Sequence, residues 1–211
     1  MEHHQITYQT VSRETFSSID NIIEKNRDAL ERYLDQLFWW NERVNLVSRD
    51  VSRGTVWEHI RHSLILTQFA PFRDSGSVVD TGTGGGLPGI PLAIAAPDKQ
   101  YLLNDIVSKK IIAVRQILLK IGLENATAEA RSVSELDIPS SALLVSKHAF
   151  KIDQLWDMVS EKPWSSLVFY KGVEFENEAA SIKDPLDIAC YDLSHGSDFY
   201  EGKVLIFVTR L

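Results

Sequence analysis

The chain has 211 residues and lacks several features that mark other classes of protein. Its only cysteine, Cys190, cannot form a disulfide within the chain, and an isolated free cysteine is typically a small buried residue. No run of about 18 uninterrupted apolar residues is present, which excludes a membrane-spanning helix. The polar segment 1–10 lacks the apolar region of a signal peptide. We therefore expect a cytoplasmic protein that does not associate with a membrane.

Basic residues are in the minority, with 22 Lys and Arg against 29 Asp and Glu, which gives a formal net charge of −7. A chain of this charge is poorly suited to coating nucleic acid non-specifically. Phosphate contacts depend on where individual Lys and Arg side chains lie, so a local basic face stays possible. The apolar fraction of 44% is ordinary for a soluble domain. We expect the protein to act as a monomer.

Two kinds of periodicity divide the chain. Helical spacing of apolar residues over 21–41 and 55–69 predicts a helical N-terminal extension that comprises residues 1–72. From residue 73 to 211, strand-like runs alternate with helices, which predicts an α/β domain with a parallel sheet and helices on both faces. The expected helices are 90–96, 108–121 (ended by Gly122) and 153–161, and the expected strands are 77–80, 100–103, 127–130, 142–146, 167–170 and 204–208.

A glycine-rich loop connects the first expected strand of this domain to the following helix. Residues 79–89 read VDTGTGGGLPG. Glycine permits positive φ and lets a ligand approach the main chain closely, and the free N–H groups of such a loop attract a carboxylate or phosphate. Gly84, Gly86 and Gly89 also match the dinucleotide spacing G-x-G-x-x-G, so the loop alone indicates a nucleotide-type cofactor of either class. We take Gly82, Gly84 and Gly86 as cofactor-binding residues.

Two acidic residues favour S-adenosylmethionine over a dinucleotide. Asp80 lies two residues before the first glycine, where it can accept hydrogen bonds from an ammonium group or its water but would repel a pyrophosphate. Asp105 follows the second strand of the domain, where a carboxylate can accept from both ribose hydroxyls in either cofactor class. The chain is also too short for a separate dehydrogenase substrate domain. A dehydrogenase is therefore the more distant alternative.

The motifs around the loop are more specific than the glycines themselves. Residues 87–92 read LPGIPL, and the other blocks are Trp40-Asn41 with Asn45-Leu46, His59 with Ser63-Leu64, Asp105 with Lys109-Lys110, and Lys171-Gly172 with acids after it. In these blocks the chain resembles the bacterial small-subunit (16S) ribosomal RNA guanine-N7 methyltransferases of the RsmG (GidB) type. The resemblance extends over most of the chain.

This resemblance implies a Rossmann-like class I S-adenosylmethionine-dependent methyltransferase fold. It implies methylation of one guanine N7 in 16S ribosomal RNA, with the RNA or the small ribosomal subunit as partner. By position, Gly82 and Leu87 would line the cofactor and Asp105 would hold its ribose. Val133 and Ser134 would lie against the adenine.

Two segments depart from the pattern of that family. Where the family has R-[AV]-E, this chain has Ser132-Val133-Ser134, or Arg131 with Val133 at the position of the acid. Where the family has S-R-A-F, residues 146–150 read SKHAF, so that either Lys147 or His148 replaces the arginine near the reaction centre. Two alternatives stay open on this basis: a methyltransferase of the same fold with another substrate, and a catalytically weakened S-adenosylmethionine-binding module.

The chemistry of guanine N7 methylation needs no general base, because N7 carries an in-plane lone pair and no proton. Catalysis then depends on positioning, which can supply roughly 7–11 kcal/mol. A cationic or hydrogen-bonding group near guanine O6 would orient the base. Lys147 and His148 are the candidates for this catalytic role.

Contact with RNA requires clustered cations and often aromatic rings on which bases stack. The candidates are Lys109, Lys110 and Arg115 on the expected helix 108–121, together with Lys171; Arg43, Arg49 and Arg61 are further ones. We expect Trp39, Trp40 and Trp57 to lie in the core, given their helical setting. His59 and His62 have a spacing that could bind a metal but no third ligand nearby, so we expect no metal.

Overall fold

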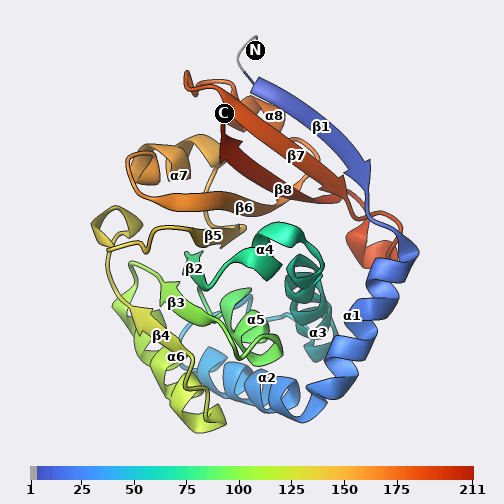
Figure 1. The fold of residues 1–211 in the computed structure, drawn as a ribbon. Coiled ribbons are helices and arrows are strands. Elements are labelled where there is room, and N and C mark those ends of the chain that lie inside the picture. The colour runs from blue at the N-terminus through green and yellow to red at the C-terminus, as the bar shows by residue number, and fades with distance from the viewer. Residues whose placement is uncertain (1–3) are drawn as a thin grey trace.

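The computed structural model describes residues 4–211, which build one eight-stranded sheet with helices on both faces (Figure 1). Strand β8 is antiparallel to both of its neighbours, and the other seven strands run in one direction. The strands in order across the sheet are β1 (His4–Thr10), β7 (Leu186–Asp192), β8 (Lys203–Arg210), β6 (Trp164–Gly172), β5 (Ala142–Lys147), β2 (Ser77–Thr81), β3 (Gln100–Asn104) and β4 (Ala126–Glu129).

Each face of the sheet has its own hydrophobic core, because neighbouring residues of a strand point to opposite faces. Val78 belongs to the larger core and Val79 to the smaller one. The larger core is covered by α1 (Arg13–Lys25), α2 (Arg27–Asn41), α3 (Arg53–Leu64), α4 (Ala70–Asp74), α5 (Gly89–Ala95) and α6 (Ser108–Ile121). The smaller core is covered by α7 (Ile152–Val159), α8 (Glu176–Ala179) and the 3₁₀ turn Val133–Glu135.

The order of the strands places the functional loops at one edge of the sheet. From β2 the chain proceeds to β3 and β4 on one side, and it then returns to β5 on the other side of β2. In parallel sheets, the crevice at such a reversal, outside the carboxyl ends of the strands, is where ligands bind. The glycine loop after β2, Asp105 after β3 and the segment 147–150 at the end of β5 therefore meet at this edge.

The N-terminal segment differs from the expected helical extension, because it begins with strand β1. Ile6, Thr7, Tyr8 and Thr10 supply the β-branched and aromatic side chains that favour a strand. This strand pairs in parallel with β7, and Ile6 packs on the smaller core. Residues 1–3, also part of the expected extension, lie outside the described residues. The remaining N-terminal helices share the larger core with the sheet.

Several element boundaries also differ from the sequence-based expectations. Two helices, α1 and α2, occupy the region predicted as one helix over 21–41, and Asn26 separates them in a non-helical conformation. Strand β7 was not predicted. Strand β8 is antiparallel to its neighbours, although a parallel sheet was expected. The helix predicted over 108–121 is confirmed as α6, with Gly122 in the left-handed conformation after it. Within residues 4–211, no helix has the length and apolar character needed to cross a membrane.

The expected core position of the tryptophans is correct for two of the three. Trp40 and Trp57 are partly buried and pack on the larger core. Trp39 is 47% exposed, so its expected core position is wrong. It lies in the last turn of α2, on the side of the helix turned away from the buried residues Leu34 and Leu37. Cys190 is buried, as expected.

Gly122 offers a test of how α6 ends. Its φ is 72°, and nothing lies within 4 Å of the position that a Cβ would occupy. We expect Gly122→Ala to lower the free energy of unfolding by about 1–2 kcal/mol, because a side chain strains the left-handed conformation. Gly76→Ala is the matched control, since a Cβ there also meets nothing within 4 Å but φ is not positive. Equal losses in urea denaturation of the two variants would contradict this explanation.

Candidate functional site

Two neighbouring cavities lie at the carboxyl ends of β2, β3 and β5. The cavity beside β3, called here the β3 cavity, has a volume of about 420 Å³. The second, called the N-terminal cavity, has a volume of about 340 Å³ and is closed by the loop before α3 and by α3 itself. Three residues line both cavities and therefore form their shared wall: Gly82, Lys147 and His148.

The β3 cavity combines one carboxylate with mostly apolar walls. Asp105 lies directly after β3, and its two carboxylate oxygens accept from the main-chain N–H groups of Val107 (2.9 Å) and Gly84 (3.2 Å). The Lys110 ammonium is 3.8 Å from one of these oxygens. The other residues that line this cavity are Asn104, Ile106, Val107, Ser132, Val133, Ala149, Phe150 and Met158.

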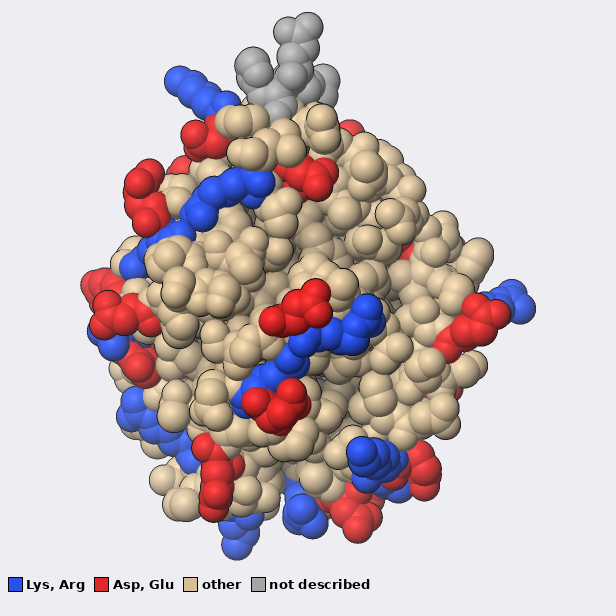
Figure 2. Space-filling view, viewed as in Figure 1, with Lys and Arg blue, Asp and Glu red and all other residues tan. Residues whose placement is uncertain are grey.

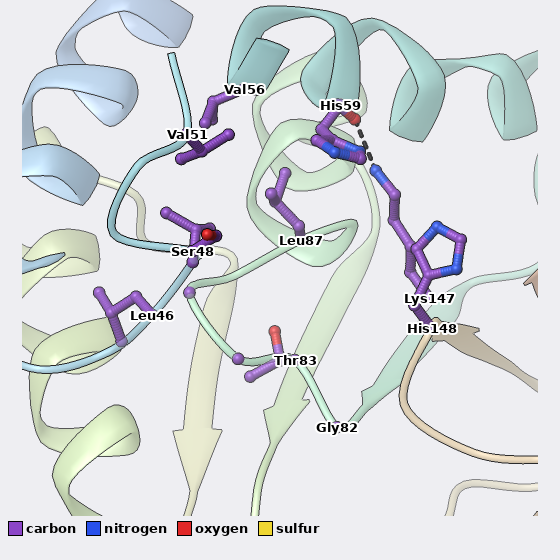
Figure 3. Close-up of a pocket in the computed structure, with 13 residues that line it drawn as sticks. Leu46, Ser48, Val51, Val56, His59, Gly82, Thr83, Leu87, Lys147 and His148 are labelled. Atoms are coloured by element: carbon purple, nitrogen blue, oxygen red, sulfur yellow. Dashed lines mark hydrogen bonds between the residues drawn. The ribbon is translucent and has the colours of Figure 1, made fainter. Parts of the chain in front are cut away.

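The N-terminal cavity is apolar on one side and polar on the other (Figure 3). Its outer wall is the loop after α2, which the Asn41 side chain holds by accepting from the N–H groups of Leu46 and Val47, both at 2.9 Å. Figure 3 shows Lys147 extending toward the main chain of His59. The remaining lining residues are Leu46, Val47, Ser48, Val51, Val56, Thr83, Gly84, Gly85 and Leu87.

The glycine loop needs glycine for reasons of space as well as of conformation. Gly82 has a φ of 72°, and a Cβ there would lie 2.3 Å from the Ala149 Cβ. Gly86 has a φ of 98°, and a Cβ there would lie 2.3 Å from the Ile90 side chain. Gly84 and Leu87 line the N-terminal cavity, whereas Gly86 is not among the lining residues of either cavity. The loop therefore presents its main chain to both cavities.

Asp80 supports this loop from beneath and does not line the cavities. Its side chain is buried, and one carboxylate oxygen accepts from the Thr83 hydroxyl (2.6 Å) and from the Gly89 N–H (2.8 Å). Burial raises the pKa of this carboxyl group to about 7. The sequence suggested that Asp80 accepts from an ammonium group or its water, but in the structure this oxygen bonds the loop and the first residue of α5.

Lys147 is a buried cation held by neutral oxygens. Its Nζ donates to the His59 carbonyl oxygen (2.8 Å) and to the Ser63 hydroxyl (3.3 Å). Burial lowers the pKa of this ammonium to about 7. His148 follows with a φ of 57°, a conformation that is uncommon outside glycine and often found at functional sites. Lys147 and His148 both reach the shared wall, so the structure keeps both as candidates.

Sequence reasoning missed His59 as a residue of this site. The sequence placed it in a family-like block and gave it no role other than that of a possible metal ligand, but its ring lines the N-terminal cavity and lies edge-on to Phe199, with ring centroids 5.2 Å apart. Burial lowers the pKa of both His59 and His148 to about 4, so both rings are neutral at pH 7. The signal available in the sequence was that His59 belongs to the family-like block with Ser63-Leu64. No cluster of three potential metal ligands occurs within residues 4–211.

Val133 and Ser134 have different surroundings. Val133 is buried and lines the β3 cavity, and the partly buried Ser132 lines it as well. Ser134 is exposed, and its hydroxyl lies 2.7 Å from that of Ser132. Of the pair Val133 and Ser134, only Val133 reaches the β3 cavity.

The four RNA-binding candidates do not form one surface. Lys109 is exposed and Lys110 lines the β3 cavity. The Arg115 Nε donates to the Ala128 carbonyl oxygen (2.8 Å). Lys171, far along the chain on β6, forms a largely buried ion pair with Glu178 at 2.6 Å. Figure 2 shows side chains of both signs interspersed over the face in view, with no extended patch of one sign.

Comparison with known proteins identifies the family of this chain. The family model described as rRNA small subunit methyltransferase G (GidB) matches residues 26–193. The chain belongs to this family. A ribosomal RNA small subunit methyltransferase G from Chlorobium luteolum is 45% identical over 193 residues, which cover 87% of this chain and 81% of that protein. One from Chlorobium limicola is 33% identical over 96% of this chain and 95% of its own length.

The fold agrees with this assignment. A SAM-dependent methyltransferase from Aquifex aeolicus has a TM-score of 0.50 and 13% identity, with 70% of this chain and 93% of that chain covered. These findings confirm the expected family, the class I methyltransferase fold and S-adenosylmethionine as the cofactor. The β3 cavity suits that cofactor, because it combines a carboxylate with apolar walls. It also exposes the main chain of Gly82, where a Cβ would clash with the Ala149 side chain.

Asp105 provides the test of cofactor binding. We expect Asp105→Ala to weaken the binding of S-adenosylhomocysteine about ten- to hundredfold, because a hydrogen bond to a charged group contributes roughly 1.5–3 kcal/mol. Isothermal titration calorimetry measures this change. Lys110→Ala is the control, since it removes the nearby ammonium and leaves the carboxylate. Unchanged affinity in Asp105→Ala, or an equal loss in Lys110→Ala, would refute a direct role for the carboxylate.

Proposed function

We propose that this enzyme transfers a methyl group from S-adenosylmethionine to N7 of a guanine in small-subunit ribosomal RNA. The relatives carry the name of small-subunit rRNA methyltransferases, which supports the substrate class. The observation that carries the proposal is the shared wall of Gly82, Lys147 and His148 between two cavities. A wall common to two cavities is where a methyl donor and an acceptor would meet.

The β3 cavity supports binding of the cofactor. The two main-chain hydrogen bonds to Asp105 leave lone pairs free on its carboxylate, which would accept from the ribose hydroxyls. Ile106, Val133 and Phe150 supply apolar surface for an adenine. When bound, S-adenosylmethionine supplies an electrophilic methyl group on its sulfonium. Because Gly82 has no side chain, its main chain would let that end of the ligand approach the shared wall closely.

The N-terminal cavity supports guanine as the acceptor base. Guanine presents two acceptors, O6 and N7, on the edge where adenine presents a donor, the N6 amino group. The polar side chains that line this cavity, all within the described part of the chain, include His59, Lys147 and His148 and no carboxylate. Side chains that donate hydrogen bonds are complementary to the guanine edge, which presents two acceptors. Leu46, Val51 and Leu87 provide apolar surface against the plane of the base.

Lys147 can orient the base only in its protonated form. An ammonium group has three donors, and two of them are used by His59 and Ser63. The third is left for guanine O6. A neutral amine has two donors, both of which are already used. Because N7 has no proton to lose, the role of Lys147 is to position the base.

A pH profile tests this role. As pH rises through about 7, Lys147 loses its proton, so we expect the single-turnover rate to fall between pH 6 and pH 8.5. His59 and His148 titrate well below this range, but Asp80 titrates within it. The Lys147→Arg variant distinguishes the titration of Lys147 from that of Asp80, because arginine stays protonated.

In the Lys147→Arg variant we expect the fall with pH to disappear. In Lys147→Met we expect a rate that does not change with pH and is about tenfold to hundredfold below the wild-type rate at pH 6. A fall that persists in the arginine variant would assign the titration to Asp80. A wild-type rate that stays flat or rises would contradict a protonated Lys147.

The reaction itself is tested with methyl-labelled S-adenosylmethionine and small ribosomal subunits from a strain that lacks this enzyme. We expect label at N7 of a single guanine, mapped by cleavage of the RNA at the methylated base, and less label with Asp105→Ala at a limiting concentration of the cofactor. Cofactor binding without label in RNA would refute the proposal. Label in a protein or small molecule would instead favour a methyltransferase with another substrate.

A further inference from the structure

A third cavity lies outside the site described above, between α2 and α6. It has a volume of about 360 Å³, and its lining residues are Gln36, Trp39, Trp40, Gln116 and Lys120. Figure 1 shows the two helices side by side at the end of the molecule opposite the N-terminal strand. We call this cavity the α2–α6 groove. Its lining is two aromatic rings, two amides and one ammonium, which differs from the aliphatic lining of an ordinary packing defect.

Trp39 is the most unusual member of the groove. A large aromatic side chain that is 47% exposed leaves much of its apolar surface in water. The guanidinium of Arg43 lies 3.7 Å from the centroid of its ring and is anchored by a hydrogen bond to the Trp39 carbonyl oxygen (2.5 Å). The Trp40 ring meets it edge-on, with centroids 5.0 Å apart. The indole is therefore held in place before any ligand binds.

The charge of α6 indicates the kind of ligand. Its 14 residues include four cations, Lys109, Lys110, Arg115 and Lys120, and no Asp or Glu, in a chain whose net charge is −7. A helix of one sign in an acidic protein favours an anionic partner. Stacking on an aromatic ring, hydrogen bonds to amides and a nearby ammonium are together what a nucleotide requires.

Each wall of the groove leads to one of the two cavities of the site. Beyond Trp39, the chain leaves α2 and forms the loop whose residue Leu46 lines the N-terminal cavity. At the other wall, Lys110 lines the β3 cavity and Lys120 lines the groove, ten residues apart or about 15 Å along a helix. One RNA strand can therefore follow α6 from the reaction site to the groove.

We propose that the α2–α6 groove binds one unpaired nucleotide of the RNA that flanks the target guanine, with its base stacked on Trp39 and its phosphate beside Lys120. This proposal rests on the proposed function, which supplies RNA as the substrate. The groove adds affinity for the RNA and takes no part in the methyl transfer. Its loss should therefore change KM and leave kcat unchanged.

The experiment compares Trp39→Leu and Lys120→Glu with wild type for two ligands, small ribosomal subunits and a short single-stranded RNA. Stacking of one base on an aromatic ring changes affinity by roughly five- to hundredfold. For Trp39→Leu we expect KM for subunits and Kd for the RNA to rise within this range, with kcat and S-adenosylhomocysteine affinity retained. Lys120→Glu should raise both values and flatten their dependence on salt. Trp39→Phe should restore most of the binding.

Matched controls lie on a distant part of the surface. Tyr8→Leu removes another exposed aromatic ring, on β1, and Lys183→Glu reverses another exposed cation. We expect neither to change KM or Kd. Wild-type values in Trp39→Leu would overturn the proposal, and so would a rise in KM for subunits with unchanged Kd for RNA, which would indicate a ribosomal protein in the groove. If wild type methylated no RNA, the proposed function would fail, and the RNA-binding comparison would still decide the role of Trp39.

Discussion

One buried carboxylate joins the three segments on which the whole site depends. Asp80 ends β2, and the same oxygen binds the Thr83 hydroxyl in the glycine loop and the Gly89 N–H at the start of α5. Gly89 allows this contact, because a Cβ there would lie 2.7 Å from that oxygen. Burial opposes the charged form of the carboxyl group, and these two donors offset part of that cost. The path of the loop, and with it the exposed main chain at Gly82, follows from this arrangement.

The loop in turn fixes the N-terminal helices. The Tyr33 hydroxyl on α2 donates to the Gly85 carbonyl oxygen at 3.0 Å, and a Cβ at Gly85 would lie 2.6 Å from the Leu37 side chain. Further along α2, Asn41 holds the start of the loop that closes the N-terminal cavity. The N-terminal helices therefore complete the N-terminal cavity instead of only covering the sheet, and one continuous chain of contacts sets both the glycine loop and the wall of this cavity.

Sequence reasoning predicted the parts of this fold that have local signals. The strand before the glycines, the helix over 108–121 and its end at Gly122 follow from apolar spacing and glycine conformation. Strand β1 was not predicted, because a few strand-favouring residues in a short polar segment are a weak local signal, and the strand forms by pairing with β7, about 180 residues later. His59 was missed for a similar reason: its role comes from a loop and a strand end that approach α3 only in the folded chain.

The electrostatics of the shared wall suit a reaction that moves a positive charge. Methyl transfer takes this charge from the sulfonium to the methylated base, so a strongly cationic wall would repel first the cofactor and then the product. His59 and His148 are neutral at pH 7 because burial lowers their pKa, and both still offer a ring N–H as a donor. Lys147 supplies the remaining charge, and its lowered pKa means that it holds its proton weakly. An arginine would keep its charge at every stage. In the proposed role, the lysine donates to the base while it is protonated and loses its charge more readily than an arginine would once the cationic product has formed.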